Sequence, residues 1–133
     1  MKVKLSEVWR AVNPRAGAMT PIDTMLKMQG VKAKTGIHIA RLAKALAQEY
    51  GTLNEKRLEI MKKHAEVTEN GEIKQDAENK VAWKEGGLEG YIKEFGELLD
   101  EEIEVNAEKV KFSEVMMIEP SLLFEMESFV EVA

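Results

Sequence analysis

The sequence predicts a mostly helical α+β fold. A long antiparallel helical hairpin over about residues 32–100 is joined to a small two- or three-stranded antiparallel sheet. Two observations predict it: two long stretches repeat apolar residues at helical spacing, and a strand-like heptapeptide occurs near each end of the chain. A length of 133 residues suits one hydrophobic core, so we expect a single domain spanning residues 1–133.

The heptapeptide at residues 2–8 recurs at residues 109–115, with six of the seven positions identical. Each copy alternates like a short strand and continues with Ser6 or Ser113, which we expect to be the N-cap of a following helix. The duplication predicts that the two ends of the chain meet in one small sheet.

Helix start and stop signals follow the first copy. Pro14 ends a short helix over residues 6–12, because the residue before proline is disfavoured in the helical region. Thr20 and Pro21 begin a second helix as N-cap and first helical residue, and Gly30 ends it.

The main element is a helix over about residues 32–64. Its apolar residues recur at spacings of three, four and seven and form one seam: Ile39, Leu42, Leu46, Leu53 and Ile60. Alanines beside this seam allow another helix to approach closely.

A second long helix is expected over about residues 77–100, after a chain reversal at Asn70-Gly71. Its apolar residues also share one face: Val81, Leu88, Ile92, Phe95 and Leu99. Glycines interrupt it at four positions: Gly86, Gly87, Gly90 and Gly96. Each costs up to about 1 kcal/mol relative to alanine, which predicts close backbone contact or a kink near Gly86-Gly87.

The rest of the chain predicts a hairpin and a final helix. Residues 103–105 and 110–112 alternate at period two on either side of a short turn, and residues 2–5 would be the third strand. Pro120 opens a short helix with one apolar side: Leu122, Leu123, Met126 and Phe129.

The composition is that of an ordinary soluble protein with extra charge, 44% hydrophobic and 32% charged. No apolar run approaches the roughly 20 residues of a membrane helix, and the N-terminus lacks the pattern of a secretory signal. We therefore expect an intracellular protein without membrane contact. The absence of Cys excludes disulfides, thiolate metal sites and Cys nucleophiles.

The charge is unevenly distributed along the chain. Residues 1–66 hold 13 basic and 6 acidic residues, a net +7, whereas residues 67–133 hold 6 basic and 18 acidic residues, a net −12. Either the halves fold against each other and neutralise, or the basic half meets an acidic partner. We favour neutralisation, because solvated charge on helices is the commoner use.

No motif specifies a reaction. His38 and His64 lie far apart on the first long helix and are expected to be structural rather than metal ligands. Acidic residues gather where the second helix ends: Glu97, Asp100, Glu101, Glu102 and Glu104. A solvated face explains this cluster better than an acid–base pair, with weak divalent-cation binding or a basic partner as the alternative. We therefore expect no enzyme activity, no catalytic or metal-binding residue and no cofactor.

Basic residues follow the first long helix: Lys32, Lys34, Arg41, Lys44, Lys56, Arg57, Lys62 and Lys63. The pI near 5.2 and the lack of a recognisable module argue against nucleic-acid binding. Methionines gather near both ends: Met19, Met25, Met28, Met116, Met117 and Met126. We expect these to fill the core, and the alternative is an adaptable binding surface.

The order of segments resembles a family of small proteins from tailed bacteriophages that is a domain of unknown function. The segments that carry the resemblance are KVKLSEV, IHIARLAKALAQEYGTLNEKRLEIMKKHAE, ENGEI, KEFGELLDEEIEV and EPSLLFEMESFV. The likeness covers nearly the whole chain and departs at the longer segment 13–30 and the glycine-rich second helix. It implies a viral origin and a setting in the host bacterial cytoplasm or the virion, and no catalytic residues.

We therefore expect a non-enzymatic phage protein that binds a phage or host protein and serves as a structural or assembly component. Self-association of the chain is compatible with this role. The alternative is an early-infection inhibitor that masks a host protein or sequesters a small ligand. Ile103 and Val105 at a sheet edge are candidates to accept a partner strand. Leu123, Phe129 and Val130 of the C-terminal helix are candidates to dock in a neighbour.

Overall fold

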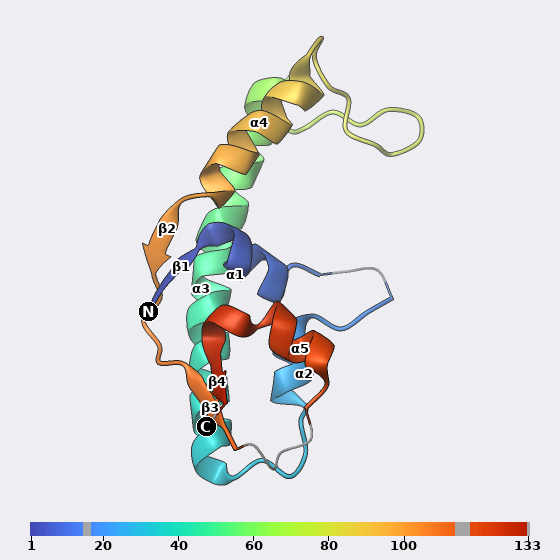
Figure 1. Cartoon of the computed structure of the whole chain (residues 1–133). Helices are drawn as coiled ribbons and strands as arrows, with labels where there is room; N and C mark the ends of the chain where they lie inside the picture. The colour runs from blue at the N-terminus through green and yellow to red at the C-terminus, as the bar shows by residue number, and fades with distance from the viewer. Residues whose placement is uncertain (15–16, 114–117, 133) are drawn as a thin grey trace. The chain divides into compact units, whose positions relative to one another are not determined.

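The computed structural model describes residues 1–14, 17–113 and 118–132, and shows a mostly helical α+β protein with two small sheets, as predicted (Figure 1). The elements in chain order are β1 (Lys2–Lys4), α1 (Leu5–Val12), α2 (Pro21–Leu26), α3 (Ala33–His64), α4 (Gly87–Leu99), β2 (Glu102–Glu104), β3 (Val110–Phe112), α5 (Pro120–Glu125), the 3-10 helix η1 (Glu127–Phe129) and β4 (Val130–Val132).

The chain divides into two compact units. Unit 1 combines Met1–Gly51 with Glu102–Ala133, and unit 2 is Thr52–Glu101. The long helix α3 therefore contributes its first half to the core of unit 1 and its last turns to unit 2.

Helix α1 begins one residue earlier than predicted. Its first residue is Leu5, so Ser6 is inside the helix and the expectation that Ser6 is the N-cap is wrong. The Glu7 carboxylate accepts a hydrogen bond from the backbone N–H of Lys4 at 2.9 Å, which satisfies this end of the helix. Asn13 ends the helix just before Pro14, as the sequence predicted.

Helix α2 begins as predicted. The Thr20 hydroxyl accepts a hydrogen bond from the backbone N–H of Asp23 at 3.2 Å, and Pro21 is the first helical residue. The helix ends at Leu26, earlier than Gly30.

Each sheet pairs a lysine-bearing strand with an acid-bearing strand. β1 pairs antiparallel with β2, which places Lys4 opposite Glu102. β3 pairs in parallel with β4, which places Lys111 opposite Glu131. Opposite charges on facing residues stabilise such pairs, and each copy of the duplicated strand lies beside an acidic neighbour.

The predicted hairpin between residues 103–105 and 110–112 is therefore wrong, and the two copies of the duplicated strand lie in different sheets. The predicted antiparallel sheet that joins an N-terminal to a C-terminal segment is present as the β1–β2 pair. The duplicated strands nonetheless bury equivalent positions. Val3 and Val110 are buried, and so are Leu5 and Phe112. The expected helix after Ser113 falls on residues 114–117, outside the described part of the chain.

The core of unit 1 is built on the predicted seam of α3. Ile39, Leu42 and Leu46 are buried there, and they belong to one cluster with Val8, Met25, Val110, Phe112, Met126 and Phe129. Met25 and Met126 thus fill the core as expected, whereas Met19 is exposed and Met116 and Met117 lie outside the described residues.

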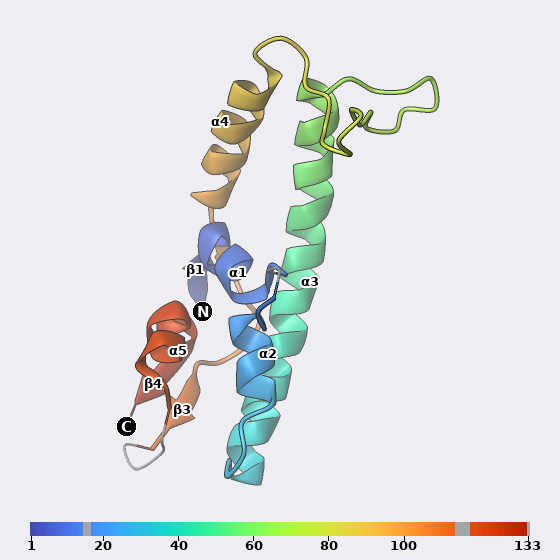
Figure 2. The same cartoon turned by 90° about the vertical axis from the view of Figure 1, so that its right-hand side faces the viewer.

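Unit 2 contains a shorter helical hairpin than predicted. Helix α4 runs antiparallel to the last turns of α3 (Figure 2). The helix expected over residues 77–100 begins only at Gly87, preceded by Gly86 in the left-handed conformation with φ +69°. The kink or close contact predicted near these glycines is confirmed.

Residues 65–86 repeat one backbone pattern every eight residues. The backbone N–H of Glu66 donates to the carbonyl of Ala82 at 2.8 Å, that of Lys74 to Glu66 at 2.9 Å, and that of Ala82 to Lys74 at 2.9 Å. These three hydrogen bonds close a ring. Antiparallel bridges follow the same period: Ala65 with Trp83, Val67 with Ile73, and Gln75 with Val81.

Each repeat ends in a tight turn. The residue pairs that close these turns by a backbone hydrogen bond are eight apart: Gly71 to Thr68, Asn79 to Asp76, and Gly87 to Lys84. Gly71 and Asn79 both have positive φ, a conformation that glycine and asparagine tolerate, whereas the third turn has its positive φ one residue earlier, at Gly86. The segment is therefore a threefold backbone repeat, which the sequence had not predicted.

Candidate interaction sites

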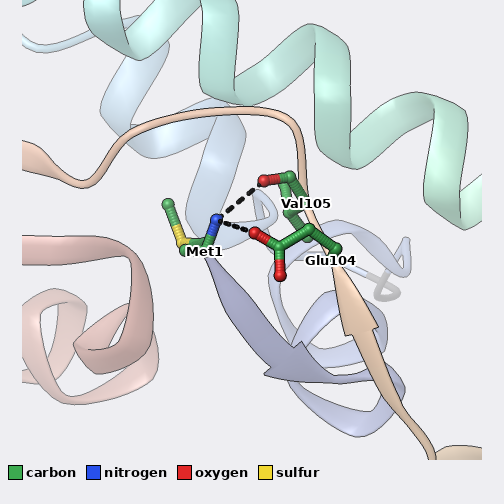
Figure 3. Close-up of polar contacts among 3 residues, drawn as sticks. All are labelled: Met1, Glu104 and Val105. Carbon is green, nitrogen blue, oxygen red and sulfur yellow. Dashed lines mark hydrogen bonds and ion pairs between the residues drawn. The ribbon is translucent and has the colours of Figure 1, made fainter.

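Two of the five predicted contact residues are core residues. Val105 and Phe129 are each 1% exposed, so neither side chain is open to a partner. The backbone of Val105 is also occupied: its N–H donates to the Met1 carbonyl at 2.8 Å, and its carbonyl accepts from the Met1 amine at 2.9 Å (Figure 3). The expectation of an open strand edge at Val105 is wrong.

The other three predicted residues are half-buried. Ile103 faces Val3 in the β1–β2 pair, Val130 faces Val110 in the β3–β4 pair, and Leu123 lies on α5. The exposed aromatic of α5 is the neighbouring Phe124, at 69% exposure. Its place outside the apolar spacing of the helix was a signal that it points away from the core.

Helix α4 contacts α3 through its small and polar residues. A Cβ atom added to Gly87 would lie 2.0 Å from the backbone oxygen of His64, and one added to Gly90 would lie 2.7 Å from the His64 ring. These distances are far below van der Waals contact, so both positions require glycine for this approach.

The His64 side chain is held by the same contact. Its Nε2 atom lies 2.8 Å from the Glu94 carboxylate, and the Lys63 ammonium lies 2.8 Å from the same oxygen. An ionised carboxylate only accepts hydrogen bonds, so Nε2 is the donor. Hydrogen bonds from Lys63 and then His64 lower the pKa of the Glu94 carboxyl from its ordinary 4.5. The His64 side chain thus connects the end of α3 to Gly90 and Glu94 of α4.

An aromatic ladder supports the first turns of α4. Trp83 and Tyr91 have ring centroids 5.1 Å apart, and Tyr91 and Phe95 stack at 5.6 Å. Such pairs contribute about 0.5–1.5 kcal/mol each beyond the area they bury. The ladder links the last repeat of the threefold segment to the helix that follows it.

The apolar seam predicted for α4 does not face α3. Leu88 and Ile92 lie one turn apart, and they are 47% and 61% exposed. The contact with α3 uses Gly87, Gly90 and Glu94, which lie on nearly the opposite side of the helix. We call Leu88 and Ile92 the α4 apolar face.

Unit 1 contains an open groove of about 850 Å³ beside α3, which we call the α3 groove. One wall is a stripe of α3, formed by His38, Arg41, Lys44, Ala45 and Gln48. The other wall is Met1 with residues 104–108. Figure 3 shows this second wall, where the Met1 amine lies 3.1 Å from the Glu104 carboxylate.

The acidic cluster expected at the end of the second helix is exposed. Its members are Glu97, Asp100, Glu101, Glu102 and Glu104. Within the described ranges, no group of three or more His, Cys, Asp or Glu side chains is placed to hold a metal ion. None of the helices in the described part of the chain is long and apolar enough to cross a membrane.

Comparison with known proteins returned no similar family, curated protein or solved structure: no family model, no curated sequence and no experimental structure matches the chain.

Proposed function

We propose that this protein is a non-enzymatic component of a tailed bacteriophage that acts by binding other proteins. Its role is structural or in assembly, and its setting is the host bacterial cytoplasm or the virion. The resemblance described above supports the phage setting. The α4 apolar face supports the binding role and is the observation that carries the proposal.

The physical argument rests on two large aliphatic side chains that are exposed to solvent on a helix whose other side is packed against α3. Leu88 and Ile92 stand at i and i+4, the spacing with which a helix anchors in a groove of another protein. Burying one such side chain fully is worth about 1.5–3 kcal/mol. Because Gly87, Gly90 and Glu94 fix the opposite side of α4, a partner can cover these residues without unfolding the hairpin.

The test substitutes the two residues of the α4 apolar face by mutating the gene for this protein in the phage genome. The double variant Leu88→Gln, Ile92→Gln keeps helix-forming residues and removes the apolar contact. We expect it to fold normally by circular dichroism but to be lost from particles or assembly complexes. The matched control, Glu89→Gln with Lys93→Gln on the same helix, should be retained. Equal retention of both variants would overturn the role of this face.

A second candidate is an early-infection inhibitor that masks a host protein or sequesters a small ligand. The exposed cluster of Glu97, Asp100, Glu101, Glu102 and Glu104 favours it, because these carboxylates complement a basic host surface. Stoichiometry and timing separate the candidates. An inhibitor is made early and binds one host protein, whereas an assembly component self-associates or persists in particles.

A further inference from the structure

The α3 groove is lined by cationic side chains and by small residues. Arg41 and Lys44 are exposed and stand on one stripe of α3. Neither forms an ion pair with any residue that the structure describes. The expected neutralisation between the two halves of the chain therefore does not reach these two residues.

The acidic side chains of the groove offset this charge only in part. The Glu104 carboxylate is paired with the Met1 amine at 3.1 Å, so these two groups balance each other. Glu108 is the remaining acid among the lining residues, against Arg41 and Lys44. The groove thus keeps a surplus of positive charge in a chain whose net charge is −5.

The shape of the groove limits what enters it. Its volume of about 850 Å³ lies within the range of pockets that hold small or short ligands, so a folded domain does not fit. Ala45 and Ala107 line it with small apolar surface, and Asn106 offers both an amide donor and an amide acceptor. An extended peptide needs these features: room for side chains, and partners for its backbone.

We propose that the α3 groove binds a short acidic polypeptide segment of a partner protein, with carboxylates at Arg41 and Lys44. Arginine pairs with carboxylates through two parallel hydrogen bonds, which gives orientation as well as attraction. This site is a different surface from the α4 apolar face, and it goes beyond the proposed function.

Nucleic acid fits the groove less well than an acidic peptide. Proteins that bind single strands without sequence preference use a continuous basic track and large aromatic side chains for stacking, and no Phe, Tyr or Trp lines this groove.

The experiment measures binding of a short fluorescein-labelled peptide of alternating Glu and Ala to the full chain by anisotropy. The same peptide with Gln in place of Glu is the control ligand. We expect saturable binding of the Glu peptide at low salt and its loss at about 1 M salt, where charges are screened within a few ångströms. The amide resonances of Ala45, Asn106 and Ala107 should shift on binding.

The double variant Arg41→Glu, Lys44→Glu should lower the affinity for the Glu peptide by about tenfold or more. The control variant Lys32→Glu, Lys34→Glu makes the same change of charge at the start of α3 and just before it, outside the groove, and should have a smaller effect. Equal loss in both variants, no binding at low salt, or unmoved groove resonances would overturn the site.

Competitors identify the ligand class and separate this site from the proposed function. Stronger binding of inorganic phosphate or of a single-stranded oligonucleotide would overturn the assignment to an acidic peptide. The groove variants leave Leu88 and Ile92 intact, so failure here does not alter the outcome expected for the α4 apolar face.

Discussion

The imidazole of His64 lies against Gly90, in space that any other side chain at position 90 would need. The same histidine reaches Glu94, one turn further along α4, at 2.8 Å. One residue at the end of α3 thus fixes both the separation of the two helices and their register. The close approach leaves the apolar seam of α4 facing outward.

Alanine at Gly87 or Gly90 should destabilise unit 2. Overpacking costs about 1–3 kcal/mol, which exceeds the helix-propensity gain of about 1 kcal/mol over glycine. Gly96 on the same helix is the matched control, because an added Cβ would meet nothing within 4 Å. Gly96→Ala should raise the free energy of unfolding in urea, measured by circular dichroism. A gain of stability in all three variants would contradict the packing described here.

The Glu94 carboxylate should make stability depend on pH. Its pKa is lowered in the folded protein, so its contribution is present at neutral pH and is lost as pH falls through and below 4.5. We expect the difference in unfolding free energy between the native chain and Glu94→Gln to shrink over that range. Lys63→Met removes the largest cause of the shift and should flatten the profile. A difference that is constant from pH 7 to about pH 3 would refute the pairing.

The ring of backbone hydrogen bonds in residues 65–86 should be sensitive to proline at one position and tolerant at another. Ala82→Pro deletes the N–H that donates to Lys74, and we expect a loss of about 3 kcal/mol or more. Ala77 is the second residue of the turn from Asp76 to Asn79, a position that favours proline. Ala77→Pro should therefore leave the urea midpoint almost unchanged, and equal effects of the two variants would argue against the repeat.

The facing charges of β1 and β2 should couple energetically. Lys4→Glu and Glu102→Lys each place like charges opposite one another, and the double variant restores an opposite pair. A double-mutant cycle of unfolding free energies should give a coupling of about 0.2–1 kcal/mol that salt reduces. Additive effects would show that the charges do not select this pairing.

The elements that the sequence predicted well are those with a long periodic signal. The seam from Ile39 to Leu53 repeats over several turns, so α3 was found with its bounds almost correct. The strands span three residues each, and alternation alone could not decide whether Val110 pairs with β2 or with β4. Both candidate partners carry acidic residues, so facing charges do not decide it either, and the burial of Val110 and Phe112 depends on contacts distant in sequence.

The threefold segment was missed because its backbone repeats while its residues do not. Equivalent positions hold Glu66, Lys74 and Ala82, which share no side-chain chemistry. The spacing of eight residues between Gly71 and Asn79 was the available signal. Among the candidate contact residues, Val105 was wrongly expected at an open edge. Its backbone pairs with Met1, and no local pattern in the sequence indicates a pairing between residues so far apart in the chain.

The most direct test of the proposed function is quantitative mass spectrometry of purified phage particles beside the infected-cell lysate, with the lysate fractionated by sedimentation. We expect several copies of the protein per particle, or its co-sedimentation with assembly complexes, and loss of both in the Leu88→Gln, Ile92→Gln variant. A structural or assembly role would be contradicted if the protein were abundant in the lysate and absent from particles, and if it sedimented alone rather than with assembly complexes.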